Sequence, residues 1–320
     1  PFMNEKFFED WSHDLKWGIH QARCVVGHNL KVAWNLTRMH SLNPKESYKK
    51  FAHQIADAIP AAGCDSQRGG WYDMMERTRK EGEETNRLVW HDRKAWWQQE
   101  QGILAYYIMA GVYDDKPEYL QFAREGSAFY NGWFLDYEEG GIYFNVLANG
   151  QPYSLGTERG KGSHSMAGYH SFELCYLSAI YTNLLINKQS MDFYFSPEAH
   201  AWKDNILRVA PDLLPKGSVE LSEVWIDGKV HTKFDKEKMH VFLPPSEKEL
   251  KVRCRISPTG IKFDADLIDY DNGIAKFNLN GDLNKTTVSD LKKEVEKLSG
   301  AKGLELDLRH LNSVDDIGLN

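Results

Sequence analysis

Three short stretches carry side chains whose types and spacing suit proton-transfer chemistry. His28 lies near the expected start of a helix, with Lys31 on the same side at about 100° per residue. Residues 96–101 form a run of tryptophan, glutamine and glutamate, and a third stretch ends in Tyr169 and His170. Histidine titrates near neutrality, so a histidine that faces a pocket can act there as an acid or a base. Taken alone, His28 fits a surface histidine on an amphipathic helix better than a pocket residue.

In this order and at these distances, the three stretches resemble the N-acylglucosamine 2-epimerase family, which also contains cellobiose 2-epimerases and aldose–ketose isomerases. Gly27 and His28, with Trp34 further along, are similar to the family's Gly-His-x-x-Glu-x-x-Trp helix. Tyr169 and His170 are similar to its Gly-Pro-Tyr/Phe-His segment. The resemblance covers about residues 1–195 and implies the second half of an (α/α)6 toroid, with His28 and His170 as the catalytic pair.

The sequence departs from the family pattern at two acidic positions. Lys31 stands where the family has a glutamate, and Gln101 stands at the acid position of the family's Trp-Trp-x-Gln-Ala-Glu run. The loss of both carboxylates would change histidine pKa values and contacts with sugar hydroxyls together. The resemblance still implies a substrate-binding role for Lys31, Gln101, Trp97 and Tyr169, with the aromatic rings suited to stacking on sugar faces.

The chemistry implied by the resemblance is removal of the proton next to the carbonyl of an open-chain sugar. Two histidines on opposite faces of the enediol give 2-epimerisation, and transfer on one face gives aldose–ketose isomerisation. We expect no metal and no cofactor if polar groups stabilise the enediolate, and no side chains have metal-ligand spacing. The alternative is a catalytically silent sugar-sensing module that passes occupancy to a regulatory C-terminal segment.

Composition limits the remaining function classes. The chain has 320 residues, 42% of them hydrophobic, and a formal net charge of −7. This negative charge gives no basic surface of the kind that binds nucleic acid. No apolar stretch of the sequence is long enough to span a membrane. The four cysteines form no Cys-x-x-Cys pair, so we expect a reducing, cytoplasmic setting. The family would place further helices before His28, so we expect the sequence to be a fragment cut at both ends, and the loss of a signal peptide stays open.

Helical periodicity and glycine pairs indicate an internal repeat in the first part of the chain. Gly-Gly-aromatic segments begin at Gly69 and Gly140, about 70 residues apart, and each follows a predicted pair of helices. Hydrophobic spacing predicts helices near residues 5–16, 26–38, 46–59, 94–109, 116–134 and 166–185.

The fold class predicted for the whole chain is therefore multidomain. Residues 1–198 are expected to form the partial all-α toroid, and residues 199–260 a small antiparallel β-domain. Residues 261–320 read as strand, strand, helix and strand, and resemble a truncated α/β STAS domain of anti-sigma-factor antagonists, which implies a protein partner. Asp316 stands where that family has its phosphorylated serine, so no phosphate-dependent switch is expected.

Two other interpretations have weaker support from the residues. The segment 156–163 resembles a phosphate loop only superficially, because its glycine spacing is wrong and no buried strand precedes it. A glycoside hydrolase needs two acids across the scissile bond. Candidates are Asp73, Glu76, Asp136 and Glu138, all within loops rich in other charges.

Overall fold

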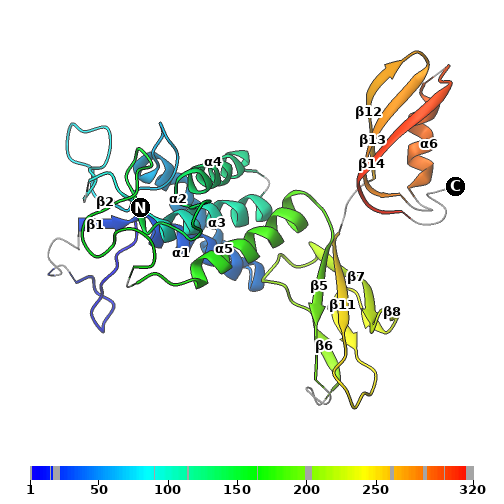
Figure 1. Ribbon diagram of the computed structural model, residues 1–320, viewed down its shortest axis with the longest axis horizontal. Coiled ribbons are helices and arrows are strands. Elements are labelled where there is room, and N and C mark those ends of the chain that lie inside the picture. The colour runs from blue at the N-terminus through cyan, green and yellow to red at the C-terminus, as the bar shows by residue number, and fades with distance from the viewer. Residues whose placement is uncertain are drawn as a thin grey trace. The chain divides into compact units, whose positions relative to one another are not determined.

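The computed structural model of the chain divides into two compact units. It describes residues 2–14, 16, 22–89, 91–113, 115–163, 165–198, 204–259, 263–283, 287–298 and 300–314. The first unit comprises residues 1–182 and 212–215, and the second comprises residues 183–211 and 216–320. The first unit is helical and the second is built mainly of strands (Figure 1).

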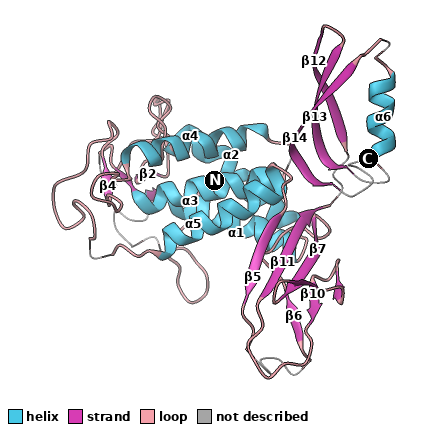
Figure 2. Cartoon of the chain, turned by 45° about the vertical axis from the view of Figure 1, so that its right-hand side comes forward, coloured by secondary structure: helices cyan, strands magenta, loops and turns pink. Residues whose placement is uncertain are grey.

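The described part of the first unit contains five α-helices, and α3 lies at their centre. Their bounds are α1 Val26–Leu42, α2 Glu46–Gly63, α3 Trp96–Val112, α4 Pro117–Trp133 and α5 Tyr169–Ile180. Helix α3 contacts α1, α4 and α5, while α2 covers another side of α1 (Figure 2). A π-helical turn, Tyr181–Ile186, continues α5. Of the helices that the structure describes, none combines the length and apolar character needed to span a bilayer.

The repeat expected from the glycine pairs is present in the structure. Strand β1 (Arg23–Val25) leads directly into α1 and pairs with β2 (Met74–Glu76), which follows α2. In the same way β3 (Lys94–Ala95) leads into α3 and pairs with β4 (Asn145–Val146), which follows α4. Both glycine pairs have left-handed φ angles of +73° to +88°, a region that glycine adopts without strain. Each strand pair therefore fixes the start of one helix of the bundle.

The helix expected at residues 5–16 is absent from the residues described there. The backbone instead turns back on itself, with an isolated bridge between Phe7 and His13. The Asp10 carboxylate accepts hydrogen bonds from the backbone N–H and the hydroxyl of Ser12, and Trp11 has a φ of 65°. Such side chain to backbone bonds compete with helix formation, and aromatic spacing alone did not reveal them.

The second unit begins with two antiparallel sheets. One is four-stranded, in the order β5 (Met191–Phe195), β11 (Val252–Pro258), β7 (Val219–Ile226) and β8 (Lys229–Val230). The other has the order β6 (Ile206–Arg208), β10 (His240–Phe242) and β9 (Phe234–Asp235). Strand β5 pairs with β11, and residues 183–198, which were predicted to belong to the helical part, lie in the second unit.

The last sheet follows the predicted order of strand, strand, helix and strand. Strands β12 (Asp264–Asp271) and β13 (Ile274–Leu283) are antiparallel, and β14 (Gly303–Val314) runs parallel to β13 after the helix α6 (Val288–Glu296). Helix α6 lies beside this sheet (Figure 2). Its apolar side chains pack on the buried face of β13, around Phe277 and Leu279. Asp316 lies outside the described residues, so its predicted effect on phosphorylation stays a prediction.

Candidate active site

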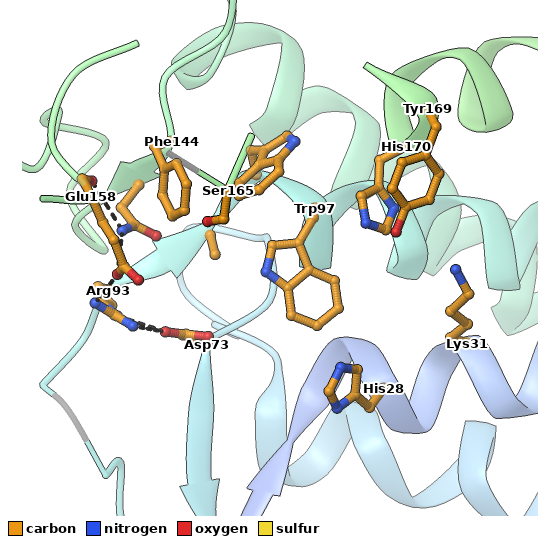
Figure 3. A pocket seen from close by; sticks show the side chains of 13 residues that line it. His28, Lys31, Asp73, Arg93, Trp97, Phe144, Glu158, Ser165, Tyr169 and His170 are labelled. Carbon is orange, nitrogen blue, oxygen red and sulfur yellow. Dashed lines mark hydrogen bonds and ion pairs between the residues drawn. The ribbon is translucent and has the colours of Figure 1, made fainter. Parts of the chain in front are cut away.

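A polar pocket of about 360 Å³ collects most of the residues that the sequence analysis selected (Figure 3). It lies at the N-terminal ends of α1, α3 and α5, where the repeated strands and loops of the helical unit meet. The residues that line it are His28, Lys31, Asp73, Arg93, Ala95, Trp96, Trp97, Phe144, Asn145, Glu158, Ser165, Tyr169 and His170. His28 and His170, far apart in the sequence, thus share one pocket.

His28 is held by a carboxylate from the irregular N-terminal segment. Its Nδ1 lies 3.1 Å from Glu5 Oε1, and Glu5 also pairs with Arg23 at 3.3 Å. Burial opposes ionisation of Glu5, but His28 and Arg23 outweigh it and lower the pKa of this carboxyl. A carboxylate accepts only, so Nδ1 of His28 carries the shared hydrogen. In the neutral ring this leaves Nε2 with its lone pair free to accept a proton.

His170 is the second residue of α5 and is 9% exposed. The Trp97 ring lies between the two histidines, with centroids 5.1 Å from His28 and 5.9 Å from His170 (Figure 3). Burial lowers the pKa of His170 to about 4, and the positive charge of Lys31 acts in the same direction. His170 is therefore neutral at physiological pH.

Lys31 and Tyr169 form the side of the pocket next to His170. The Lys31 ammonium lies 3.9 Å from Glu173 Oε2 and 5.6 Å from the Tyr169 ring centroid. Tyr169 contacts His170, with ring centroids 4.0 Å apart, and is 56% exposed. A cation and an exposed aromatic ring thus border the pocket near one histidine.

The opposite side of the pocket is a charged cluster around Arg93. Its guanidinium donates to Asp73 Oδ2 at 2.6 Å and to Glu158 Oε2 at 2.8 Å. Asp73 also accepts from the Gln98 amide, whose oxygen accepts the backbone N–H of Gly27 at 2.6 Å. This chain of bonds ties the start of α1, and hence His28, to α3.

Four consecutive polar residues of α3, positions 98–101, are fully buried. Successive side chains on a helix point about 100° apart, so the run needs polar partners on every side. Gln99 bonds to both backbone groups of Trp71, and Glu100 accepts from Tyr130 and Ser171 at 2.6 Å each. Burial raises the pKa of Glu100 to about 7.

Gln101 lies behind His170 and does not line the pocket. Its side chain is 0% exposed, and its Nε2 is 3.1 Å from His170 Nδ1. The sequence predicted that Gln101 binds substrate, but in this structure its side chain has no exposed surface in the pocket. The other predicted site residues, His28, Lys31, Trp97, Tyr169 and His170, do line the pocket.

Sequence reasoning missed several partners of these side chains. Glu5 was assigned to a helix that does not form, and Arg93 and Glu158 were not considered as site residues. Glu173 is three positions after His170, a spacing that puts both on one helix face, so it could have been found from the sequence. Asp73 was named only as a candidate glycosidase acid.

The cluster at Arg93 also bears on the two weaker interpretations. Glu158 lies within the glycine-rich segment 156–163 and contributes a carboxylate to the pocket, which is unsuited to holding phosphate. One guanidinium binds both Asp73 and Glu158, whereas glycoside hydrolysis needs a protonated acid opposite a free carboxylate. Within the described part of the chain, no group of three or more His, Cys, Asp or Glu side chains is arranged to hold a metal ion.

Comparison with known proteins gives matches only among solved structures. No protein-family model matches the sequence, and no curated protein matches it. The chain is similar to a cellobiose 2-epimerase from Bacillus thermoamylovorans B4167, with 19% identity, a TM-score of 0.45 and coverage of 56% of this chain and 41% of that chain. It is also similar to a D-mannose isomerase, with 18% identity, a TM-score of 0.48 and coverage of 56% and 44%. The chain thus spans less than half the length of these structures.

Proposed function

We propose that the full-length protein is a sugar 2-epimerase or aldose–ketose isomerase that moves a proton through an enediol. The observation that carries the proposal is the shared pocket in which His28 and His170 flank Trp97. The order and spacing of the motifs around these residues, which resemble the N-acylglucosamine 2-epimerase family, support the same chemistry.

His28 is the better placed of the two histidines to act as the base. Its Nδ1–H donates a hydrogen bond to Glu5, and the described residues provide no hydrogen-bond partner for Nε2. A carboxylate that accepts from one imidazole nitrogen stabilises the ring after the other nitrogen takes up a proton. His28 therefore has the arrangement needed to remove the proton next to a sugar carbonyl.

The rest of the pocket supplies what the enediolate and the sugar need. Lys31 brings a cation to the side where His170 lies, and a positive charge fixed near a developing oxyanion stabilises it. Trp97 and Tyr169 present ring faces on which a sugar can stack. The reaction class requires no redox cofactor, because one proton is removed and one is returned and no electrons are gained or lost overall.

A sugar-binding module without turnover is the second candidate, and one observation favours it. An amide, not a carboxylate, contacts His170, and this histidine stays neutral well below pH 7. In this alternative the C-terminal segment binds a protein partner and reports sugar occupancy to it.

Hydrogen exchange at C2 tests the proposal directly. The full-length protein is incubated with aldoses, N-acylhexosamines and β-linked disaccharides in heavy water, and deuterium at C2 is followed by NMR. We expect exchange with at least one sugar, and its loss in His28→Ala. His231→Ala, which changes a half-buried histidine of the second unit, is the control and should exchange normally. Sugar binding without exchange would favour the sensing module.

A further inference from the structure

The amide of Gln101 has one allowed orientation. Its Oε1 lies 2.9 Å from the indole Nε1 of Trp34, and its Nε2 lies 3.2 Å from Glu173 Oε2. An indole N–H can only donate a hydrogen bond, and a carboxylate can only accept one. A flipped amide would place oxygen against carboxylate and N–H against N–H. The oxygen and nitrogen of Gln101 are therefore assigned by their partners and not by convention.

This orientation determines where the proton of His170 resides. The Nε2 of Gln101, a donor, is 3.1 Å from His170 Nδ1, so Nδ1 must accept and cannot carry a hydrogen. A neutral imidazole has one N–H, which is then on Nε2. Among the described residues no hydrogen-bond partner occupies Nε2, and His170 lines the pocket.

We propose that Gln101 is a positioning residue that holds His170 as its neutral Nε2–H tautomer, so that His170 offers the pocket a hydrogen-bond donor and His28 is the one base. The inference rests on the proposed function and narrows it. The two histidines thus receive opposite tautomers from their partners, since Glu5 places the hydrogen of His28 on Nδ1. The low pKa of His170 agrees with this assignment, because protonation would add a hydrogen on Nδ1 against the amide N–H.

A single base determines the product. His28 Nε2 takes the C2 proton, the C2–H electron pair becomes the C1=C2 bond, and the C1=O1 π pair moves to O1, which accepts a hydrogen bond from His170. The hydroxyl proton of O2 then passes to O1. Protonated His28 returns its proton to C1 from the same side while the electron pair left on O2 forms the C2=O2 bond, which gives the ketose. Epimerisation needs a second group that donates to C2 from the other face. We therefore infer aldose–ketose isomerisation and not 2-epimerisation.

The tautomer can be measured without any sugar, by long-range proton–nitrogen NMR of the full-length protein labelled with ¹⁵N-histidine. We expect a protonated Nε2 and an unprotonated Nδ1 for His170 from pH 8 to about 5. The informative variant is the charge-conserving exchange Gln101→Glu with Glu173→Gln, which puts the carboxylate against His170. It should move the hydrogen to Nδ1 and raise the pKa of His170 by about one unit or more. Gln151→Glu, an exposed loop change, should do neither.

The outcomes separate this inference from the proposed function. A protonated Nδ1 of His170 in the wild-type protein would overturn the inference. This measurement uses the wild-type protein alone, so it does not depend on whether a variant folds. An Nε2–H tautomer together with a C2 epimer as the main product would overturn the single-base step. The expected tautomer with no deuterium exchange on any sugar would support the assignment of His170 and overturn the proposed function. A ketose as the wild-type product, with an epimer gained in the exchanged variant, would support both.

Discussion

At the scale of single residues, the two pocket histidines differ in their partners more than in their positions. Both lie next to Trp97, but a carboxylate holds His28 and an amide holds His170. Because a carboxylate accepts and an amide nitrogen donates, the same side chain becomes a base in one place and a donor in the other. The chemistry of the pocket is therefore set by residues just outside it.

The first prediction concerns Glu5. Glu5→Gln keeps the shape of the side chain but removes the charge that stabilises protonated His28. We expect C2 exchange to fall about 10²-fold, the lower end of what a positioned proton-transfer group contributes. Sugar affinity should change little, since Glu5 does not line the pocket. Glu9→Gln, on the exposed part of the same segment, is the control, and an equal loss in both variants would contradict the role of Glu5.

The second prediction uses the buried carboxyl of Glu100. Its pKa is about 7 in the folded protein, raised mainly by burial and opposed by Ser171 and Tyr130, against an ordinary value of 4.5. Between these values the folded state holds a proton that the unfolded state has released, so stability falls as pH rises from 4.5 to 7. Glu100→Gln does not titrate there. Its stability relative to wild type should rise by up to about 3 kcal/mol across that window.

Urea unfolding of both proteins at several pH values measures this difference. His170 has the opposite sign, because its lowered pKa makes stability fall as pH decreases from 6.5 to about 4. That contribution is common to both proteins and cancels in the difference. Parallel stability profiles for wild type and Glu100→Gln would show that Glu100 is ionised in the folded state.

Motifs in the sequence identified the two histidines of the pocket, but they did not identify the residues that hydrogen-bond to these histidines. His28 and His170 could be selected because each belongs to a short recognisable stretch. The partner of His28 could not, because Glu5 lies in a segment whose turn depends on Asp10 and whose contact with α1 is long-range. Gln101 was predicted to bind substrate, but the sequence could not show that it is buried, since its burial depends on the packing of α3 against α5.

At the scale of elements, helices with regular apolar spacing were predicted well and irregular segments were not. Helix α2 has its buried face at Ala52, Ile55, Ala56 and Ile59, a spacing visible in the sequence. Helix α3 could be predicted as a helix, but its buried polar run at positions 98–101 gives no amphipathic pattern. Polar side chains can be buried on every side of α3 only because neighbouring elements on each side offer them hydrogen-bond partners.

The close approach of α1 and α3 provides the third prediction. A Cβ added at Gly27 would lie 2.8 Å from both Gln98 Cγ and Trp97 Cζ3, closer than carbon atoms pack. We expect Gly27→Ala to push α1 away from α3, costing about 1–3 kcal/mol and separating His28 from Trp97.

Thermal unfolding and C2 exchange together test this expectation. Gly132→Ala is the matched control, because a Cβ there meets nothing within 4 Å on helix α4. It should leave exchange unchanged and add stability, since alanine is the better helix former by about 1 kcal/mol. If Gly27→Ala behaved like this control, the helices would not be in the contact described.

At the scale of the whole molecule, the chain passes between its two units more than once. Residues 183–211 belong to the second unit, residues 212–215 to the helical unit, and residues from 216 onward to the second unit again. Alternating apolar residues predicted the strands of the second unit, but they could not predict this return. In the returning segment, Asp212 forms a charge pair with Arg38 of α1, 174 residues away in the sequence.

That charge pair gives the last prediction. Arg38 Nε donates to Asp212 Oδ2 at 2.8 Å, and the Tyr181 hydroxyl donates to the same oxygen at 2.8 Å. The Asp212 side chain is 6% exposed, so Arg38→Met would leave a buried carboxylate without its cation. Removing one partner of a buried pair costs about 3 kcal/mol or more. We expect this loss in the unfolding of the helical unit.

Hydrogen exchange followed by mass spectrometry locates the effect along the chain. Amides of residues 212–214 should exchange faster in Arg38→Met, while those of β7 and β11, which belong to the other unit, should not change. Arg208→Met is the control, because its partner Asp204 is exposed and such pairs contribute little. Unchanged exchange at residues 212–214 would mean that contacts other than Arg38 hold this segment in the helical unit. Faster exchange confined to it would identify Arg38 as the residue that fixes where the chain returns.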